Sequence, residues 1–411
     1  NWDQGNGSAR VAWVNGNNDT AIFAGTAGTV SLGTGITVGG LQFDTASYII
    51  QNNTLTWGTA GSIVANQNAT ISSIMAGSVE ITKSGAGTLM LTAANTYSGG
   101  TIVSNGLLVL DKTGKSGTTP ILPANSSLTI TNATVSLAGG TTSNAIYNTT
   151  DGAITLNGGG TLAASQTTFN AHNVYNVIMN GGLLTAGAGT LDGALANWYI
   201  NNTISNTADS TISASLGRNS NNASLPVNVA NGTTLLISGP LVNIIGANGL
   251  TKSGEGTLSL SGTNTYTGVS TVNAGTLEIS GAGLLGSGSY AAGIVNNGVL
   301  LLNSTAEQTL GGIISGTGAL VKASSVTLTL TNVSSYTGGT TVNAGTLILG
   351  AGGNNACVRG ALTVNAGATV TATVANAFGI VNTLSTLNIN GGNVDLATGQ
   401  QHIWGTTVNM V

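Results

Sequence analysis

Apolar and polar residues alternate along most of this chain with a period of two. In the segment Leu250–Ile279, Leu258 and Leu260 flank a serine, and Leu277 and Ile279 flank a glutamate. Alternate side chains of a β-strand point to opposite faces, so we expect these four apolar side chains to point into a core. The alternating segments run for about five residues, the usual length of a strand. No segment carries the apolar stripe of an amphipathic helix, so the pattern predicts an all-β fold.

A thirty-residue segment recurs three times without a gap. The copies are Ile81–Leu110, Leu250–Ile279 and Leu320–Leu349. Within a copy, a second period of nineteen residues separates glycines such as Gly87 and Gly106. A repeat of about twenty residues that holds two or three short strands has the size of one turn of a parallel β-helix. We therefore predict a single elongated β-solenoid over residues 1–411 with roughly twenty turns, and a less regular middle over residues 111–249.

The composition agrees with stacked turns. Charged residues make up only 5% of the chain, against roughly 25% in an ordinary soluble domain. Each position of a β-solenoid recurs directly above itself, so a charge repeated in one column would repel its neighbours. Thr, Ser and Asn can form hydrogen-bonded ladders instead. The 63 glycines suit corners that need positive φ. A proline in a central strand would remove a hydrogen bond between strands, and the chain has only 4 prolines.

Each copy places a tyrosine between a strand and a glycine turn. These residues are Tyr97, Tyr266 and Tyr336. We interpret each as a corner residue whose ring closes one end of the core while its hydroxyl reaches water. The alternative is a row of aromatic platforms for sugars. It is disfavoured because the copies are 169 and 70 residues apart, too far for one contiguous platform.

The three copies resemble the autotransporter-associated β-strand repeat, also called the passenger-associated transport repeat. The resemblance rests on the lysine, the G-x-G-T-L strand, the N-x-Y-[ST]-G corner and the A-G-T-L motif near the end of each copy. The third copy departs from it, because "KASSV" lacks both glycines after the lysine, and this puts its turn geometry in question. The opening region, with Trp2, Trp13 and "VGGLQFD", also looks like the start of such proteins.

This resemblance implies a right-handed parallel β-helix that is secreted or displayed on a bacterial surface. Complete autotransporters end in a transmembrane β-barrel, and "QQHIWGTTVNMV" does not resemble one. We therefore expect a passenger-like chain without the C-terminal barrel, from which a signal peptide has been removed. The other possibility is that a barrel or anchor was cleaved from a monomeric passenger.

Several function classes are disfavoured by the sequence. No stretch approaches ~18 consecutive apolar residues, so we expect no transmembrane segment. The eight Lys and Arg are scattered, which argues against nucleic-acid binding. Asp192 and Asp209, with Arg218 beyond, are the one acid pair near an arginine, a weak candidate for glycoside hydrolysis, which needs two carboxylates at a fixed separation. His172 and His402 stand alone, so we expect neither a metal site nor another cofactor.

Three further features have ordinary structural interpretations. The charged stretch Asp111–Lys115 is interpreted as a solvated loop. The segment Gly281–Gly286 fits G-x-G-x-x-G, but no helical pattern follows it, as a dinucleotide site would need. The single cysteine, Cys357, is interpreted as a buried inert thiol, with an intermolecular disulfide as the alternative.

The sequence therefore predicts a non-enzymatic extracellular structural protein without catalytic residues. The main hypothesis is self-association, end to end and laterally, into a surface layer or filament. Apolar residues at outward positions, Met90, Val109 and Ile348, support the lateral contact. The alternative is an autotransporter-type adhesin passenger that binds a glycan or host ligand on a lateral face.

Overall fold

The computed structural model describes residues 12–113, 119–138, 145–146, 150–164, 172–186, 198–397, 401 and 405–411. The chain forms two compact units, residues 1–192 (unit 1) and 193–411 (unit 2). Both consist of short parallel strands wound into a β-solenoid, with about 16 turns in all, which confirms the expected fold class. The expectation of one continuous solenoid over residues 1–411 stays a prediction. None of the described segments is a helix long and apolar enough to cross a membrane.

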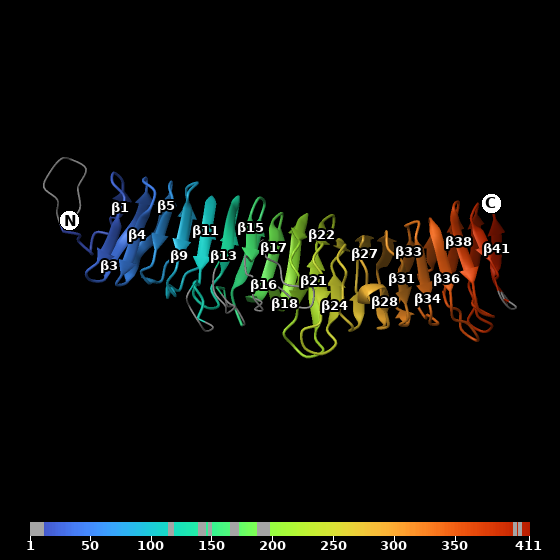
Figure 1. Ribbon diagram of the computed structural model, residues 1–411. Coiled ribbons are helices and arrows are strands. Elements are labelled where there is room, and N and C mark those ends of the chain that lie inside the picture. Colours follow the sequence, from blue (N-terminus) through green and yellow to red (C-terminus); the bar gives the residue numbers. More distant parts are fainter. Residues whose placement is uncertain are drawn as a thin grey trace. The chain divides into compact units, whose positions relative to one another are not determined.

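Unit 1 contains two ladders of parallel strands (Figure 1). The first ladder consists of β1 (Thr20–Phe23), β3 (Ile36–Phe43), β5 (Leu55–Ala65), β7 (Met75–Ala76), β8 (Ile81–Ser84), β10 (Thr101–Val103), β12 (Leu128–Ile130), β14 (Ala153–Asn157) and β16 (His172–Asn180). The second consists of β2 (Thr29–Leu32), β4 (Tyr48–Asn52), β6 (Ala69–Ile71), β9 (Thr88–Leu91), β11 (Gly106–Asp111), β13 (Ala133–Ala138), β15 (Thr161–Ala164) and β17 (Leu183–Ala186).

Unit 2 contains three ladders. Ladder I consists of β18 (Trp198–Ala208), β20 (Leu216–Gly217), β21 (Ser224–Val229), β23 (Leu241–Val242), β24 (Gly249–Ser253), β26 (Ser270–Val272), β29 (Ile294–Asn296) and β32 (Ile314–Ser315). Ladder II consists of β19 (Ser210–Ile212), β22 (Thr234–Ile237), β25 (Thr257–Leu260), β27 (Thr276–Gly281), β30 (Val299–Ser304), β33 (Ala319–Lys322), β35 (Thr340–Val342), β37 (Ala361–Asn365), β39 (Thr386–Asn390) and β41 (Thr407–Met410). Ladder III consists of β28 (Ser289–Tyr290), β31 (Gln308–Leu310), β34 (Thr327–Leu330), β36 (Gly345–Leu349), β38 (Ala368–Ala372) and β40 (Asn393–Asp395). A three-residue 3₁₀ turn, η1 (Gly286–Gly288), precedes ladder III.

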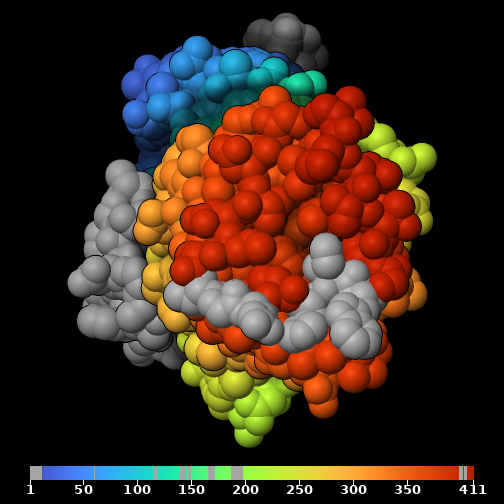
Figure 2. All heavy atoms as spheres, turned by 90° about the vertical axis from the view of Figure 1, so that its right-hand side faces the viewer, coloured from blue at the N-terminus to red at the C-terminus, as the bar shows by residue number. Residues whose placement is uncertain are grey.

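The core follows the period-two pattern of the sequence. Leu258, Leu260, Leu277 and Ile279 are all fully buried, as predicted. Strand β25 pairs with β27 so that Leu258 lies over Leu277 and Leu260 over Ile279. The same inward position therefore repeats its apolar side chain from turn to turn, which stacks the core into columns. At the end of unit 2, the atoms of the last strands are visible in Figure 2, and β41 is exposed along its length.

Outward columns carry the expected polar ladders. In unit 2 the Nδ2 of Asn365 donates to Oδ1 of Asn343 at 2.7 Å, and the Nδ2 of Asn390 donates to Oδ1 of Asn365 at 3.2 Å. Asn409 donates in the same way to Asn388 at 2.8 Å. Because each amide offers a donor and an acceptor, a column of asparagines satisfies itself without charge.

The repeated tyrosines differ from the expectation. Tyr97, Tyr266 and Tyr336 are at most 2% exposed, so the prediction that their hydroxyls reach water is wrong. Each hydroxyl instead forms a hydrogen bond with a hydroxyl four residues later in the chain, that of Thr101, Ser270 or Thr340. Burial accordingly raises the pKa of all three phenols. The tyrosines are therefore core residues whose polar end is satisfied internally.

Candidate functional site: a polar groove over a glycine column

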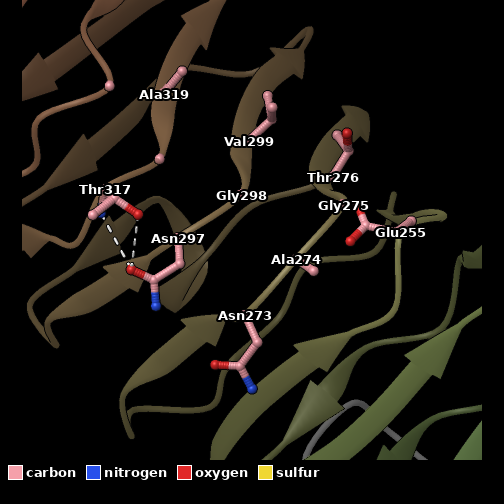
Figure 3. A pocket seen from close by; sticks show the side chains of 12 residues that line it. Glu255, Asn273, Ala274, Gly275, Thr276, Asn297, Gly298, Val299, Thr317 and Ala319 are labelled. Carbon is pink, nitrogen blue, oxygen red and sulfur yellow. Dashed lines mark hydrogen bonds between the residues drawn. The ribbon is translucent and has the colours of Figure 1, made fainter.

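Unit 2 carries a groove of about 570 Å³ on its outer surface. Figure 3 shows the side chains around it. The lining residues are Glu255, Asn273, Ala274, Gly275, Thr276, Asn297, Gly298, Val299, Thr317, Gly318, Ala319 and Gly338. The groove follows the corner between ladders I and II, because its walls come from the ends of β26, β29 and β32 and from the starts of β27, β30 and β33.

Glycines form the floor of the groove over successive turns. A Cβ added to Gly275 would lie 2.4 Å from the carbonyl oxygen of Gly256. One added to Gly298 would lie 2.3 Å from that of Gly275, and one on Gly318 would lie 2.1 Å from that of Gly298. Neighbouring turns approach too closely at this corner to accept any side chain, and the missing side chains leave the groove.

One wall of the groove presents amides and hydroxyls. The backbone N–H of Thr317 donates to Oδ1 of Asn297 at 3.2 Å, and the Thr317 hydroxyl lies 3.5 Å from the same oxygen (Figure 3). Within the part of the chain that the structure describes, the amide nitrogen of Asn297 and the whole side-chain amide of Asn273 have no hydrogen-bond partner. The opposite wall is formed by Thr276, Val299 and Ala319. The groove therefore offers hydrogen-bonding groups beside short apolar surfaces.

The groove does not hold the groups that hydrolysis requires. Glu255 is the one carboxylate among its lining residues. Both the retaining and the inverting mechanisms of glycoside hydrolysis use two carboxyl groups at a set separation. The arrangement suits binding of a neutral polar ligand rather than acid–base chemistry.

A buried lysine lies beneath one end of the groove. The Lys252 ammonium donates to the carbonyl oxygens of Ser253 at 3.0 Å, Gly254 at 2.6 Å and Ala274 at 3.1 Å. The Lys252 side chain is fully buried, and desolvation lowers its pKa to about 8. Its ammonium ties two successive turns together by capping carbonyl oxygens that point into the corner.

The other repeated lysines occupy the same setting. Lys83 in unit 1 donates to the carbonyl oxygens of Gly85 at 2.7 Å, Gly87 at 2.9 Å and Asn105 at 2.8 Å. Burial lowers its pKa to about 8 as well. Lys322 donates to the carbonyl oxygen of Ser324 and, at 3.1 Å, to that of Ala344. Sequence reasoning found these lysines by their alignment but did not foresee that they are buried. The clue was their position in phase with the inward residues of the strand.

Of the candidates for glycoside hydrolysis, the structure describes Asp209 and Arg218, and each has its own backbone hydrogen-bond partner. Oδ1 of Asp209 accepts a hydrogen bond from the backbone N–H of Thr234 at 2.7 Å, which links neighbouring turns. Arg218 donates from Nη1 to the carbonyl oxygen of Asn202 at 2.9 Å, and no acidic side chain pairs with it among the described residues. Asp192 lies outside the described residues.

The remaining polar candidates are buried or lie outside the described residues. His172 is 1% exposed, and burial, together with the charge of Lys112, lowers its pKa to about 3. His402 and Lys115 lie outside the described residues. In the ranges that are described, no three His, Cys, Asp or Glu side chains gather as metal ligands. Cys357 is fully buried, and burial raises the pKa of its thiol to about 12, in keeping with an inert thiol.

The glycine motif at Gly281–Gly286 begins at the end of β27 and leads into η1, which is only three residues long. There is therefore no helix N-terminus at this place that would bind a phosphate.

Comparison with known proteins connects the repeats to a family. The model of the passenger-associated-transport-repeat matches residues 81–110, 250–279 and 320–349. The adhesin BmaC autotransporter of Brucella suis biovar 1 (strain 1330) is 33% identical over 513 residues. That alignment covers 96% of this chain, which spans about 15% of the relative's length. No solved structure matches. The chain therefore carries three copies of the passenger-associated-transport-repeat, and the strands of these copies form part of the solenoid.

Proposed function

We propose that this chain is a non-catalytic segment of an autotransporter passenger, displayed outside the cell, that binds a ligand on a lateral face of the solenoid as part of an adhesin. The observation that carries the proposal is the similarity of nearly the whole chain to a protein named as an adhesin. The groove along the glycine column adds a surface on which the side-chain amide of Asn273 and the amide nitrogen of Asn297 are unpaired among the described residues.

The ligand class that the groove fits is a neutral glycan. Its wall offers amide and hydroxyl groups that can exchange hydrogen bonds with sugar hydroxyls, and its single carboxylate, that of Glu255, can accept further hydrogen bonds from them. A chain of sugars that follows the groove would meet a similar set of groups once per turn, because the turns stack at about 4.8 Å.

A saccharide array, followed by titration of the best glycan, tests this proposal. We expect the purified chain to bind, and a variant with both Asn273→Ala and Asn297→Ala to bind at least about tenfold more weakly, because two hydrogen-bonding groups are lost. The matched control is Asn393→Ala, an exposed asparagine on β40. Failure of the chain to bind any glycan or any host cell would contradict the proposal. Equal loss with the control variant would contradict the location.

Lateral self-association is a second candidate, favoured by one feature of unit 1. Met90 of β9 lies beside Val109 of β11 in the outward column, and both are partly exposed. Two adjacent apolar side chains on a polar face can pack against another copy. Light scattering at micromolar concentration is the test. We expect particles larger than one chain, and a shift toward single chains in the Met90→Glu, Val109→Glu variant. A chain that stays monomeric without these substitutions would contradict self-association.

A further inference from the structure

Positive charge is almost entirely hidden in the described residues. The basic residues among them are Lys83, Lys112, Lys252, Lys322, Arg218 and Arg359. The four lysines are at most 1% exposed, whereas Arg218 and Arg359 are partly exposed. A negatively charged ligand that approaches the described surface can therefore meet a cation only at one of these two arginines.

Arg218 differs from the buried lysines in how its donors are used. Lys252 directs its ammonium at three carbonyl oxygens. Arg218 has one hydrogen bond, from Nη1 to the carbonyl oxygen of Asn202, although a guanidinium carries five N–H donors. Its Nε is buried without a hydrogen-bond partner. No acidic side chain among the described residues offsets its charge.

This arrangement is unfavourable unless a group other than the described residues completes it. A partly buried charge without a counter-charge or full hydrogen bonding destabilises a fold. Desolvation already lowers the pKa of Arg218, which shows that water around the guanidinium is reduced. A group that is costly for the fold and that has free donors is a candidate for ligand recognition.

Arg218 lies at the start of the loop that follows β20. A small cavity of about 10 Å³ beside it has room for no more than one water, and its lining, which includes Gly249, is mostly apolar apart from Arg218, Asn248 and Tyr266. Gly249, but not Arg218, also lines a groove of about 400 Å³, whose other lining residues are Asn222, Ser224, three threonines, Gly268 and the apolar Ala247, Val269 and Ala292. Asn248 and Asn222 belong to two loops that pack on each other: Nδ2 of Asn248 donates to the carbonyl oxygen of Ser220 at 2.7 Å. The loops project from unit 2 beside β21 and β24 in Figure 1.

We propose that Arg218 is the anchor of an anion-binding site that takes the carboxylate or sulfate group of an acidic glycan. The planar guanidinium matches either oxyanion with two parallel hydrogen bonds, and the hydroxyl- and amide-lined groove nearby receives the sugar. This inference rests on the proposed ligand-binding function and adds a second, charged subsite on the same unit.

The test uses the full chain and two probes that separate the sources of the oxyanion: hyaluronan for carboxylates and dextran sulfate for sulfates. Binding is measured by calorimetry at low and high salt. We expect one of the probes to bind, with an affinity that weakens as salt screens the charge. Arg218→Gln should lower that affinity at least about tenfold. Arg218→Lys should lower it less than Arg218→Gln, because a lysine keeps the charge but lacks the two parallel N–H donors of a guanidinium.

The matched control is Arg359→Gln, which removes the other partly exposed arginine of the same unit and should leave the affinity unchanged. Thermal melting of each variant shows whether a loss of affinity comes from unfolding or from the lost contact with the ligand. No binding of either probe, or equal losses for both arginines, would overturn the inference. A chain that still binds neutral glycans or host cells while ignoring both probes would contradict this site and leave the proposed function standing.

Discussion

The second and third repeats, both in unit 2, share one sequence pattern but occupy different faces of the solenoid. In the second repeat the lysine strand β24 belongs to ladder I and the next strand, β25, to ladder II. In the third repeat the lysine strand β33 belongs to ladder II and β34 to ladder III. The third copy is thus shifted by one face relative to the second.

Pairing inside each copy is nevertheless the same. Leu250 lies beside Ser270 in the second copy, and Leu320 lies beside Thr340 in the third, twenty residues on in both. Each repeat therefore contains strands of two successive turns, and these strands pair with each other. Which face it occupies depends on the length of the chain between the copies, since a third of a turn can be added or removed there.

Two of the differences between the copies change a turn residue and a buried amide. The glycine two residues after the lysine, Gly254, has φ +75° in the second copy, whereas Ser324 at that position of the third adopts no positive φ. The buried Asn264 bridges three turns, and Ser334 replaces it. The lysine ammonium is buried among carbonyl oxygens in both copies, so the corner tolerates either turn.

The largest expected effect breaks the common core of both copies. Leu260→Asp and Leu330→Asp each place a carboxylate at an inward position that is at most 1% exposed, and each should lower the free energy of unfolding by several kcal/mol. Urea unfolding of the purified chain measures the loss. Thr329→Asp, at an outward position of β34, is the control and should change little. If Leu260→Asp unfolded like the unsubstituted chain, the inward assignment would be wrong.

Exchanging the turn residues tests the difference between the copies. Gly254→Ser forces a side chain into positive φ and places its Cβ 2.2 Å from the carbonyl oxygen of Val229, so we expect a loss of about 3 kcal/mol. The reverse change, Ser324→Gly, should cost less than about 1 kcal/mol, through the added freedom of the unfolded chain. Chemical denaturation gives both values. Equal losses would mean that the two turns have one geometry.

A smaller effect is expected where the second copy uses an amide as a bridge. Oδ1 of Asn264 accepts from the N–H of Leu241 at 3.0 Å, and Nδ2 donates to the carbonyl oxygens of Gly262 at 2.9 Å and Leu284 at 3.0 Å. Asn264→Ser should cost about 1–2 kcal/mol, because a serine cannot reach all three groups. Amide hydrogen exchange should also speed up at Leu241. No change at Leu241 would show that the amide is not the bridge.

Lysine titration gives the smallest effect. Desolvation lowers the pKa of Lys252 to about 8 in the folded chain, from a value of 10.5 when unperturbed. Between these two values the unfolded state binds more protons, so stability should rise as pH increases from about 8 to 10.5. The carbonyl oxygens around the ammonium favour its charged form and keep the rise shallow. Lys252→Met should flatten the rise, and an unchanged pH profile in that variant would assign the slope to other groups.

The alternation of Leu258 and Leu260 and the recurrence of the thirty-residue segment were enough to predict the strands, the inward residues and the parallel solenoid. The burial of Lys252 and of the Tyr266 hydroxyl was not predictable in the same way. Polar side chains were assumed to seek water, and the partners that satisfy them, such as the carbonyl oxygen of Ala274, come from the next turn of the chain.

The groove could not be predicted from the sequence either. Its floor glycines Gly275, Gly298, Gly318 and Gly338 stack on one another although twenty-three, twenty and twenty residues separate them. Because the turns differ in length, the sequence spacing does not show which glycines lie above one another until the strand register is known. In the sequence, Arg218 follows two acids, Asp192 and Asp209, which suggested an acid pair beside an arginine. In the structure, no acidic side chain among the described residues pairs with Arg218, so we interpret it as a ligand-binding group instead.

The central claim is that the lysines, tyrosines and alternate leucines that recur in the repeats build the interior of the solenoid, which leaves recognition to outward side chains. Amine-reactive labelling of the native chain at pH 8, with mass spectrometry of its peptides, tests this directly. We predict that Lys83, Lys252 and Lys322 stay unlabelled in the folded chain, because each is at most 1% exposed, and react fully after unfolding in guanidinium. Rapid labelling of these three lysines in the folded chain would contradict the account.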